Sequence, residues 1–502
     1  EIYNFRELRA ELLAAGHRFA TGSDAEVVVH LYEEHGEGLV ERLVGMFAFA
    51  LSDQRDPHRP RLLLARDRLG IKPLYWSEDE SGLAFASQPK ALLARDGGRT
   101  RRRLRAAALL DYLVQGYVGG EHSAWSGIRR LPPGTTLSWS PGEAPALRRY
   151  WDLPRDGLRG AAPVEELLEW LDRCVGEHLE SDVPLGAFLS GGIDSTAVAD
   201  SMARALGGPP VLCSVGFEES SHDELDTARA SAARLGAVHH CEVLRPDPRA
   251  ALEQLPWIYD EPLADPSTLP TWLVSRTARD HVTVALSGDG GDETFAGYRR
   301  YVHDLAENRL RRRLGRPGAR LLGALGAVYP RLQWAPRPLR ARTFLRNLGS
   351  EPARAYWRSV TQLERDEALE LLAPELASAL AGHDPFEAFE EHYRAPAVDD
   401  PLYRAQYADL HTYLPDQILA KVDRASMGVG LEVRVPLLDH RFVERFAPLP
   451  AEEKVQGGRG KHALREALRG RLPGAILDGA KRGFDTPLAA WLRGPLAGQA
   501  AE

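Results

Sequence analysis

Hydrophobic and polar positions divide the chain into a strand-rich first part and a longer second part in which strands alternate with helices. Up to about Tyr150, short apolar runs stand between charged or Pro/Gly-rich turns, a pattern typical of β-strands. It predicts strands over residues 45–51, 61–66 and 83–86. Apolar residues at helical spacing predict two helices in the same part, over residues 5–15 and 24–35.

The pattern changes after Tyr150 to Pro163, a segment interrupted by proline and glycine that we interpret as an interdomain linker. Beyond it, strands are expected over residues 183–189, 211–217, 240–244 and 282–286. Helices are expected between them, over residues 195–206, 223–235 and 252–259. Such alternation predicts an α/β fold with a mainly parallel sheet and helices on both of its faces. From about Glu390 onward we expect helices.

Composition narrows the class of protein. The 502 residues are 44% hydrophobic and 27% charged, which allows two to four domains and excludes wholesale disorder. The net charge of −8 argues against a nucleic-acid or membrane-surface binder. The arginine-rich residues 310–346 are therefore interpreted as a solvated helical surface, not as an RNA-binding face. The longest apolar stretch, near residues 321–328, is far shorter than the ~18 residues that cross a bilayer.

The three cysteines and the two ends of the chain each give a further expectation. Cys174, Cys213 and Cys241 form no CxxC pair, which favours neither disulfides nor a zinc site and indicates a reducing cytoplasm. Each is expected to be a small buried apolar residue. The sequence opens at Glu1 without an initiator methionine or signal peptide, and we interpret both ends as cut from a longer chain.

The first loop with candidate chemistry is Leu189-Ser190-Gly191-Gly192-Ile193-Asp194-Ser195, between a predicted strand and a predicted helix. Its two glycines let the backbone turn tightly and direct N–H groups at an anion, and the helix N-terminus adds partial positive charge. Ser190 and Ser195 add hydroxyl donors, and the carboxylate of Asp194 suits Mg²⁺. Because no GxxxxGK(S/T) motif is present, pyrophosphate is a better candidate ligand than a transferred γ-phosphoryl group.

A second loop, Leu286-Ser287-Gly288-Asp289-Gly290-Gly291-Asp292-Glu293, also follows a predicted strand. Three acids so close together repel one another unless a cation or a substrate joins them. In a parallel sheet both loops lie at the carboxyl ends of strands, where ligands bind. We therefore expect Asp194 and Asp292 to share Mg²⁺ against the phosphates of a nucleotide.

These loops and several shorter motifs resemble the glutamine-hydrolysing asparagine synthetases, which are class II amidotransferases, over nearly the whole chain. The first loop looks like the pyrophosphate loop of that family. Other synthetase-like motifs lie at residues 260–262, 265–267, 296–298, 421–424 and 431–439. Motifs similar to the glutaminase domain lie at residues 1–4, 21–26, 45–49 and 65–75.

The resemblance implies a two-domain architecture. Residues 1–152 would be an N-terminally truncated glutaminase domain of the Ntn-type α+β fold. Residues 163–502 would be a parallel-sheet ATP-pyrophosphatase synthetase domain with a helical C-terminal part, shortened at its end. A homodimer is one arrangement that the resemblance allows, since family members are often dimers.

The resemblance also implies a reaction. In the family, an N-terminal cysteine releases ammonia from glutamine, and ATP with Mg²⁺ activates the aspartate side chain as β-aspartyl-AMP. Ammonia then displaces AMP, and asparagine forms. The implied partners are the small molecules ATP, aspartate and glutamine or ammonia, with no nucleic acid and no membrane. As given, the chain carries no N-terminal cysteine, so we expect it to use free ammonia.

The resemblance assigns roles residue by residue. The AMP part would contact Leu189, Val215, Ser287 and Gly288, and the pyrophosphate would contact Ser190, Gly191, Gly192, Asp194 and Ser195. Lys481 matches a lysine that offsets phosphate charge, with a surface lysine in a basic tail as the alternative. Asp289 stands where the best-known members carry a glutamate that positions and deprotonates ammonia. An aspartate there keeps the carboxylate but reaches about 1.5 Å less far.

On the glutamine side, Asp24 corresponds to the residue that binds the glutamine α-amino group, and Glu1 belongs to the glutamine-binding strand. A helix N-cap formed by Ser23 or Asp24 is the alternative role. Two rival functions are weighed against asparagine synthesis. One is a related adenylating ligase or a cyclase similar to β-lactam synthetase, and the other is a non-catalytic nucleotide-binding relative.

Overall fold

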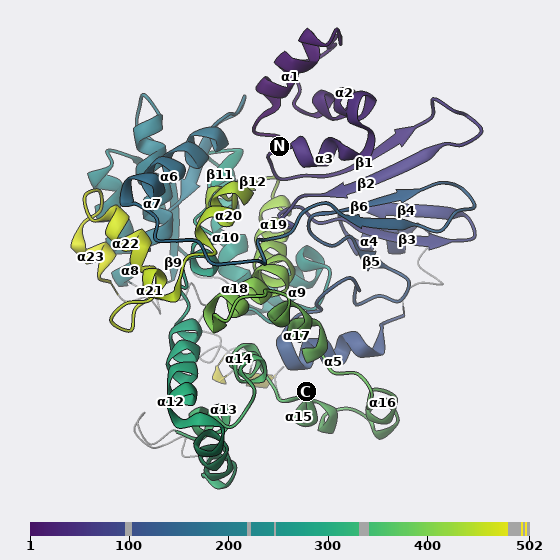
Figure 1. The fold of residues 1–502 in the computed structure, drawn as a ribbon. Helices are drawn as coiled ribbons and strands as arrows, with labels where there is room; N and C mark the ends of the chain where they lie inside the picture. The colour runs from purple at the N-terminus through teal and green to yellow at the C-terminus, as the bar shows by residue number, and fades with distance from the viewer. Residues whose placement is uncertain are drawn as a thin grey trace.

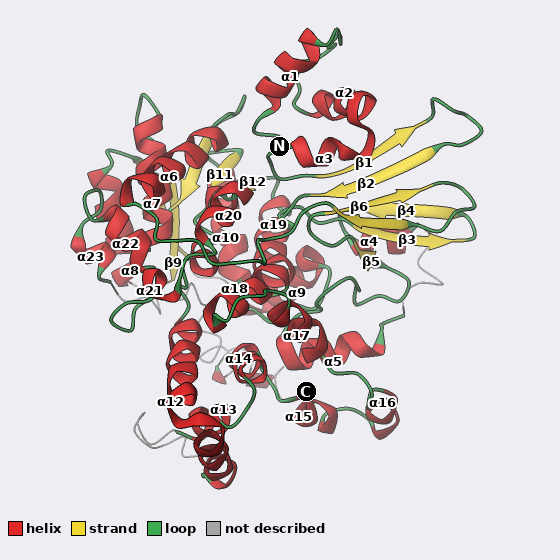
Figure 2. Cartoon of the chain, viewed as in Figure 1, coloured by secondary structure: helices red, strands yellow, loops and turns green. Residues whose placement is uncertain are grey.

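The first part of the chain forms four layers, in which two antiparallel sheets lie between helices (Figures 1 and 2). The computed structural model describes residues 1–95, 103–217, 222–244, 247–330, 341–479, 493–494 and 497–498. One sheet has the order β1-β2-β6-β7, with strands Ala48–Asp53, Arg61–Arg66, Thr135–Trp139 and Ala146–Arg149. The other has the order β4-β3-β5, with strands Gly82–Ala86, Tyr75–Asp79 and Arg129–Arg130.

Side chains that alternate between the two faces of each strand build these layers. On β2, Leu63 packs among the helices that cover the first sheet, whereas Leu64 packs between the two sheets. On β3, Trp76 joins Leu64 between the sheets and Tyr75 faces the helix on the outer side. Successive side chains of a strand point to opposite faces, so each strand supplies two layers. The covering helices are α1 (Phe5–Ala14), α2 (Ala25–His35), η1 (Gly36–Gly38), α3 (Leu39–Arg42) and α4 (Pro89–Ala94).

The second part contains a five-stranded sheet of order β10-β9-β8-β11-β12, in which every neighbouring pair is parallel. Its strands are β8 (Leu185–Phe188), β9 (Val211–Phe217), β10 (Val238–Leu244), β11 (Val284–Leu286) and β12 (Glu432–Arg434). Helix α6 (Val164–His178) precedes the first of these strands, and α7 (Ile193–Ala205), α8 (His222–Arg234), α9 (Pro248–Tyr259), α10 (Thr268–Arg279) and α11 (Gly291–Thr294) lie between them in the chain. The parallel sheet with helices on both faces is therefore confirmed.

Strand β12 corrects the expectation that the chain is helical throughout from Glu390. Residues 432–434 pair in parallel with β11, from Val284↔Glu432 to Leu286↔Arg434. A strand of three residues carries too little periodicity to be recognised locally. It forms because its partner, which is distant in the sequence, offers an open edge of the sheet.

The remaining elements are helical, and some pack on the faces of the parallel sheet while others extend away from it (Figure 1). They are α5 (Ala106–Gln115), α12 (Arg299–Val328), α13 (Arg342–Leu348), α14 (Pro352–Val360), α15 (Arg365–Glu370), α16 (Pro374–Ala379), α17 (Phe386–Arg394), α18 (Pro401–His411), η3 (Leu414–Leu419), α19 (Ala420–Met427), η4 (Pro436–Leu438), α20 (His440–Phe446), α21 (Ala451–Lys454), α22 (His462–Leu468) and α23 (Gly474–Leu477). Helix α5 belongs to the first part but packs Leu110 and Val114 among these helices.

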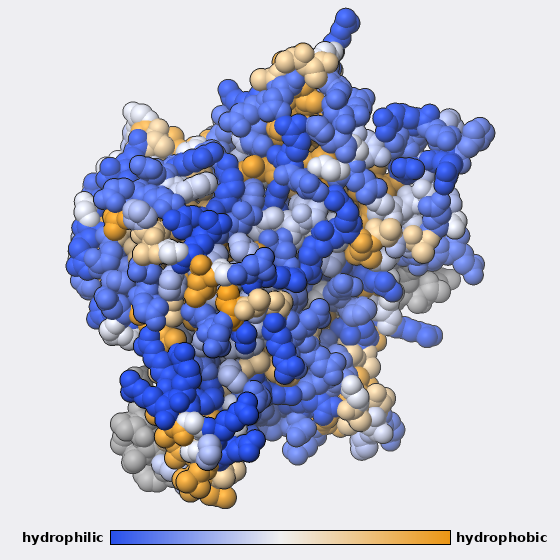
Figure 3. All heavy atoms as spheres, viewed as in Figure 1, coloured by the Kyte–Doolittle hydropathy of each residue, from blue (hydrophilic) through white to orange (hydrophobic). Residues whose placement is uncertain are grey.

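Helix α12 contains a break at Gly315, whose φ of 64° is left-handed. The surface seen in Figure 3 is mostly hydrophilic, and apolar side chains gather at the far end of α12 and α13. Leu321 and Val328 are the most exposed of these, at 65% and 80%. Among the described residues, no helix is both long and apolar enough to cross a membrane.

Candidate active site

The two glycine- and acid-rich loops lie side by side at the carboxyl ends of β8 and β11, which are neighbours in the parallel sheet. They border a cavity of about 1010 Å³. The cavity is lined by all the nucleotide-site residues expected from the sequence in these loops, and by Val215 on β9. A cavity of this size is comparable to the larger small-molecule sites of proteins.

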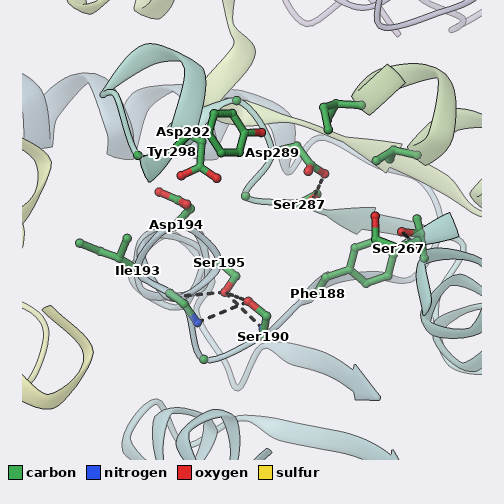
Figure 4. A pocket seen from close by; sticks show the side chains of 18 of the residues that line it. Phe188, Ser190, Ile193, Asp194, Ser195, Ser267, Ser287, Asp289, Asp292 and Tyr298 are labelled. Atoms are coloured by element: carbon green, nitrogen blue, oxygen red, sulfur yellow. Dashed lines mark hydrogen bonds between the residues drawn. The ribbon is translucent and has the colours of Figure 1, made fainter. Parts of the chain in front are cut away.

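The first loop is shaped by hydroxyl groups and by one left-handed glycine. Gly191 has a φ of 76°, which glycine adopts without steric cost. The hydroxyls of Ser190 and Ser195 lie 3.0 Å apart, and the Ser190 N–H donates to Ser195 Oγ at 3.2 Å. Thr196 Oγ1 donates to the Gly192 carbonyl at 2.7 Å. These bonds hold the loop curled over the N-terminus of α7, as Figure 4 shows for Ser190 and Ser195.

Two glycines of the second loop allow it to approach the first. A Cβ on Gly288 would lie 2.7 Å from the Ser195 amide nitrogen. A Cβ on Gly291 would lie 2.5 Å from Asp194 Oδ1. Real Cβ atoms do not come so close to other atoms, so the contact between the loops requires glycine at both positions. Within the second loop, Ser287 Oγ donates to Asp289 Oδ2 at 2.6 Å and orients that carboxylate toward the cavity (Figure 4).

A lysine that the sequence analysis did not identify joins the two acidic loops. Lys461 Nζ contacts Asp194 Oδ2 and lies 2.6 Å from Asp292 Oδ1. Burial alone would lower the pKa of Lys461, but the two carboxylates outweigh it and raise the pKa above its usual value. Lys461 has a left-handed φ of 61° and directly precedes α22. A strained non-glycine residue beside two glycine-rich loops is typical of a functional site.

The side chains of Asp194 and Asp292 fit a divalent cation. Both carboxylates reach one nitrogen atom, so both can reach one cation, and Figure 4 shows them next to each other on one side of the cavity. Two carboxylates against one ammonium group leave a net negative charge, and carboxylate oxygens are the ligands that Mg²⁺ prefers. The placement of Asp194 and Asp292 at one rim of the sheet agrees with the expectation from the sequence. Their role as metal ligands stays a prediction.

The opposite wall of the cavity carries a second lysine–carboxylate group. Lys421 Nζ donates to Ser267 Oγ at 2.7 Å and lies 3.2 Å from Asp265 Oδ2. Gln417 Nε2 donates to the same Asp265 oxygen at 3.2 Å. Asp265 and Lys421 lie in two of the synthetase-like motifs of the sequence but had no expected role. Polar groups fixed in this way can orient a charged substrate.

Glu293 is a further residue of the cavity wall without an expected role. Burial, with the neighbouring charge of Asp292, raises the pKa of Glu293 to about 7. The Tyr298 hydroxyl donates to Glu293 Oε1 at 2.7 Å. Nothing in the local sequence distinguishes this glutamate from the other acids of the loop, because its burial depends on helices from later in the chain. Lys481, which the resemblance pointed to, lies outside the described residues.

The residues expected to bind glutamine lie together in the first part of the chain. Asp24 Oδ2 accepts the Ile2 N–H at 2.8 Å, and Asp24 makes no side-chain capping bond to α2. Asp24 thus stands at the N-cap position of α2, but its carboxylate is directed toward the first residues, whereas Ser23 Oγ accepts the Ala25 N–H at 3.2 Å. Burial raises the pKa of Glu1, and the nearby charge of Asp24 acts in the same direction. Glu1 Oε2 lies 3.2 Å from Arg434, which ends strand β12 of the parallel sheet.

A buried ion cluster also connects the two parts of the chain. Arg130 of β5 lies 2.9 Å from Asp416 Oδ1 and 3.2 Å from Glu261 Oε2. All three side chains are at least nine-tenths buried. The Tyr75 hydroxyl donates to the same Glu261 oxygen at 2.6 Å. Because its charges come from both parts of the chain, this cluster fixes the orientation of the antiparallel sheets relative to the synthetase-like part.

The cysteines lie where the sequence placed them. Cys174 in α6 and Cys213 in β9 are buried, as expected for small apolar residues. Cys241 in β10 is only partly buried. Burial raises the pKa of both Cys174 and Cys213, which keeps their thiols protonated and unreactive.

Comparison with known proteins identifies both parts of the chain. The asparagine synthase family matches residues 166–502, and the glutamine amidotransferase domain matches residues 1–151. A putative glutamine-hydrolyzing asparagine synthetase of Mycobacterium bovis is 36% identical over 98% of this chain and 75% of that protein. Glutamine-hydrolyzing asparagine synthetase 1 of Bacillus subtilis is 31% identical over 98% of this chain and 76% of that protein.

A more distant relative carries a different name. A protein of Gibberella zeae called Amidase chry2 is 27% identical over 99% of this chain and 77% of that protein. The matches to synthetases span both the antiparallel sheets and the part that holds the cavity. The chain thus belongs to the asparagine synthetase family of glutamine-hydrolysing ligases, with a glutamine amidotransferase domain followed by an asparagine synthase domain.

Proposed function

We propose that this chain catalyses ATP-dependent formation of asparagine from aspartate through β-aspartyl-AMP. An oxygen of the aspartate side chain attacks the α-phosphorus of ATP, and pyrophosphate leaves. Ammonia then attacks the acyl carbon, AMP leaves, and the ammonia nitrogen loses one proton. Ammonia, either free or released from glutamine, supplies the nitrogen.

One observation carries the proposal: the convergence of two glycine-rich loops and Lys461 on one cavity. The backbone of residues 190–192 and the N-terminus of α7 would bind the pyrophosphate, with Ser190 and Ser195 as hydroxyl donors. Leu189 and Val215 would contact the purine, and Ser287 and Gly288 the rest of the AMP part. Lys461 would offset the negative charge that develops when pyrophosphate leaves.

Mg²⁺ is part of this proposal, with Asp194 and Asp292 as its protein ligands. When bound, the ion would neutralise phosphate charge and hold the triphosphate in line for displacement. Lys461 neutralises part of the charge of the two carboxylates and keeps them oriented toward the cavity. Asp289, oriented by Ser287, would receive the proton that ammonia loses.

The test measures aspartate-dependent exchange of pyrophosphate into ATP, together with AMP and amide formation from aspartate, ammonium chloride and MgATP. We expect exchange with aspartate alone and amide only when ammonium is added. Absence of exchange with aspartate would overturn the proposal. The fungal relative with an amidase name makes a panel of other carboxylates necessary. Exchange with one of them instead would assign the chain to the related adenylating ligases.

A further inference from the structure

A cluster of two histidines and one glutamate lies on α1 and α2, away from the cavity (Figure 1). His17 follows α1, whereas His30 and Glu33 lie one turn apart on α2. His17 Nδ1 lies 3.1 Å from His30 Nδ1 and 3.3 Å from Glu33 Oε2. His30 Nδ1 lies 2.8 Å from the same Glu33 oxygen. Three potential ligand atoms therefore form a nearly equilateral triangle.

The size of this triangle suits a tetrahedral metal ion. With metal–ligand bonds of about 2.0–2.1 Å, two ligand atoms of a tetrahedral site lie about 3.3 Å apart. The three distances in the cluster lie close to this value, so little movement is needed to bind an ion. Without a metal, only the ring N–H protons can donate hydrogen bonds between the two imidazole nitrogens and the carboxylate oxygen.

The outer ring nitrogens face carboxylates. His17 Nε2 lies 2.8 Å from Glu34 Oε1, and His30 Nε2 lies 3.8 Å from Glu26 Oε1. Metal-binding histidines usually donate their second N–H to a carboxylate, which fixes the tautomer and the ring orientation. The arrangement leaves Nδ1 of each ring as the atom that points into the triangle. A T-shaped aromatic contact adds to this order, since the Phe19 ring meets the His30 ring edge-on with their centroids 4.7 Å apart.

The site is accessible to ions. The side chains of His17 and His30 are 14% and 16% exposed, and that of Glu33 is 45% exposed. Two imidazoles and one carboxylate are ligands that suit Zn²⁺ and similar transition-metal ions better than Mg²⁺. Three protein ligands leave a fourth position for water.

We propose that His17, His30 and Glu33 bind one divalent transition-metal ion of the zinc type. The ion joins the turn after α1 to the middle and second half of α2, and so links the two ends of the segment of residues 18–29. Asp24 lies in this loop and accepts the Ile2 N–H. Glu26 reinforces the loop from the other side, because it accepts the N–H groups of Ala20 and Thr21 at 2.6 and 2.7 Å. The ion thereby orders the segment that carries Asp24 in the amidotransferase domain.

The test titrates the chelator-treated protein with Zn²⁺ by calorimetry and with Co²⁺ by visible absorption, in the presence of Mg²⁺. We expect one Zn²⁺ per chain, a Co²⁺ spectrum typical of low coordination number, and a higher Tm with Zn²⁺. The double variant H17Q/H30Q should lose stoichiometric binding, the Co²⁺ spectrum and the Zn²⁺-induced rise in Tm. The variant E34Q, which alters only an outer carboxylate, should weaken Zn²⁺ binding about tenfold.

His35 provides a matched control, because it lies on the same helix and is exposed but stands outside the triangle. H35Q should bind Zn²⁺ as the parent chain does. If H17Q/H30Q fails to fold, E33Q serves as a milder variant and should weaken binding while keeping the Tm without metal. The proposal is overturned if the parent chain takes up no stoichiometric Zn²⁺, or if H17Q/H30Q and E33Q both bind it like H35Q.

Discussion

Nζ of Lys461 lies 2.6 Å from Oδ1 of Asp292, and the same nitrogen contacts the carboxylate of Asp194. One lysine from near the end of the described chain therefore joins two acidic loops that follow neighbouring strands. Without this contact the two carboxylates would repel each other across a partly buried gap. Because Lys461 directly precedes α22, its contacts with the two aspartates make the geometry of the candidate nucleotide site depend on that segment.

Replacing Lys461 with methionine should remove this link. We expect pyrophosphate exchange to fall by about 10²–10³-fold, because a positioned cation no longer offsets phosphate charge. The free energy of unfolding should fall by about 3 kcal/mol, since two facing carboxylates lose their shared partner. Denaturant unfolding and exchange assays measure the two effects. The double variant K461M/D292N relieves the repulsion and should recover stability without recovering exchange.

Asp289 should act after adenylation. In D289N the amide keeps the shape of the side chain but cannot accept a proton, so amide formation should fall by about 10²–10³-fold. Pyrophosphate exchange should stay near the parent value, because Asp289 has no part in releasing pyrophosphate. D289E restores the carboxylate and should recover part of the amide formation. An equal loss of exchange and amide formation in D289N would contradict the assigned role.

Gly297 should tolerate no side chain. A Cβ there would lie 1.9 Å from Asp292 Oδ1 and 2.2 Å from Lys461 Cε, so G297A must displace the pair that joins the loops. We expect loss of pyrophosphate exchange and a lower Tm. G176A is the matched control, because Gly176 is an exposed residue of α6 and a Cβ there would meet no other described part of the chain within 4 Å. This substitution should stabilise the helix by about 0.5–1 kcal/mol and leave exchange unchanged.

Lys454 should make stability depend on pH. Burial lowers the pKa of Lys454 to about 7, and its Nζ donates to Gln406 Oε1 at 2.5 Å. Between pH 7 and about 10.5 the unfolded chain binds a proton that the folded chain does not bind. The free energy of unfolding of the parent chain should therefore rise with pH relative to K454M, by up to about 1.4 kcal/mol per pH unit. Urea unfolding at pH 7, 8 and 9 measures the difference, and a constant difference would contradict the prediction.

Arg130 should hold the two parts of the chain together. R130M leaves Glu261 and Asp416 buried without their shared cation, so the free energy of unfolding should fall by about 3–5 kcal/mol. The triple variant R130M/E261Q/D416N removes the two carboxylate charges and should recover part of the loss. Ammonia-dependent amide formation should persist in the folded fraction, because the cluster lies outside the walls of the cavity. Calorimetric melting and the ammonia assay test both points.

Local sequence was enough to predict the elements that hold the two loops. The first loop follows β8 directly and leads into α7, so the apolar run, the Ser-Gly-Gly turn and the helical spacing lie next to one another in the sequence. The acidic loop likewise follows β11 directly. Where such units repeat, a parallel sheet follows from general rules of chain connection, and so does the meeting of both loops at one edge. The pairing of β12 could not be predicted, because its three residues become a strand only beside β11.

The glycines, hydroxyls and acids of the two loops could be located from local sequence, because turn conformation and hydrophobic periodicity depend on neighbouring residues. Tertiary packing decided which cation joins Asp194 to Asp292, and that the Asp24 carboxylate turns toward Ile2. Tertiary packing also decided which of the three acids in the second loop is fully buried, namely Glu293. Each of these depends on packing between segments far apart in the chain, and no local pattern of residues records which distant side chains will meet.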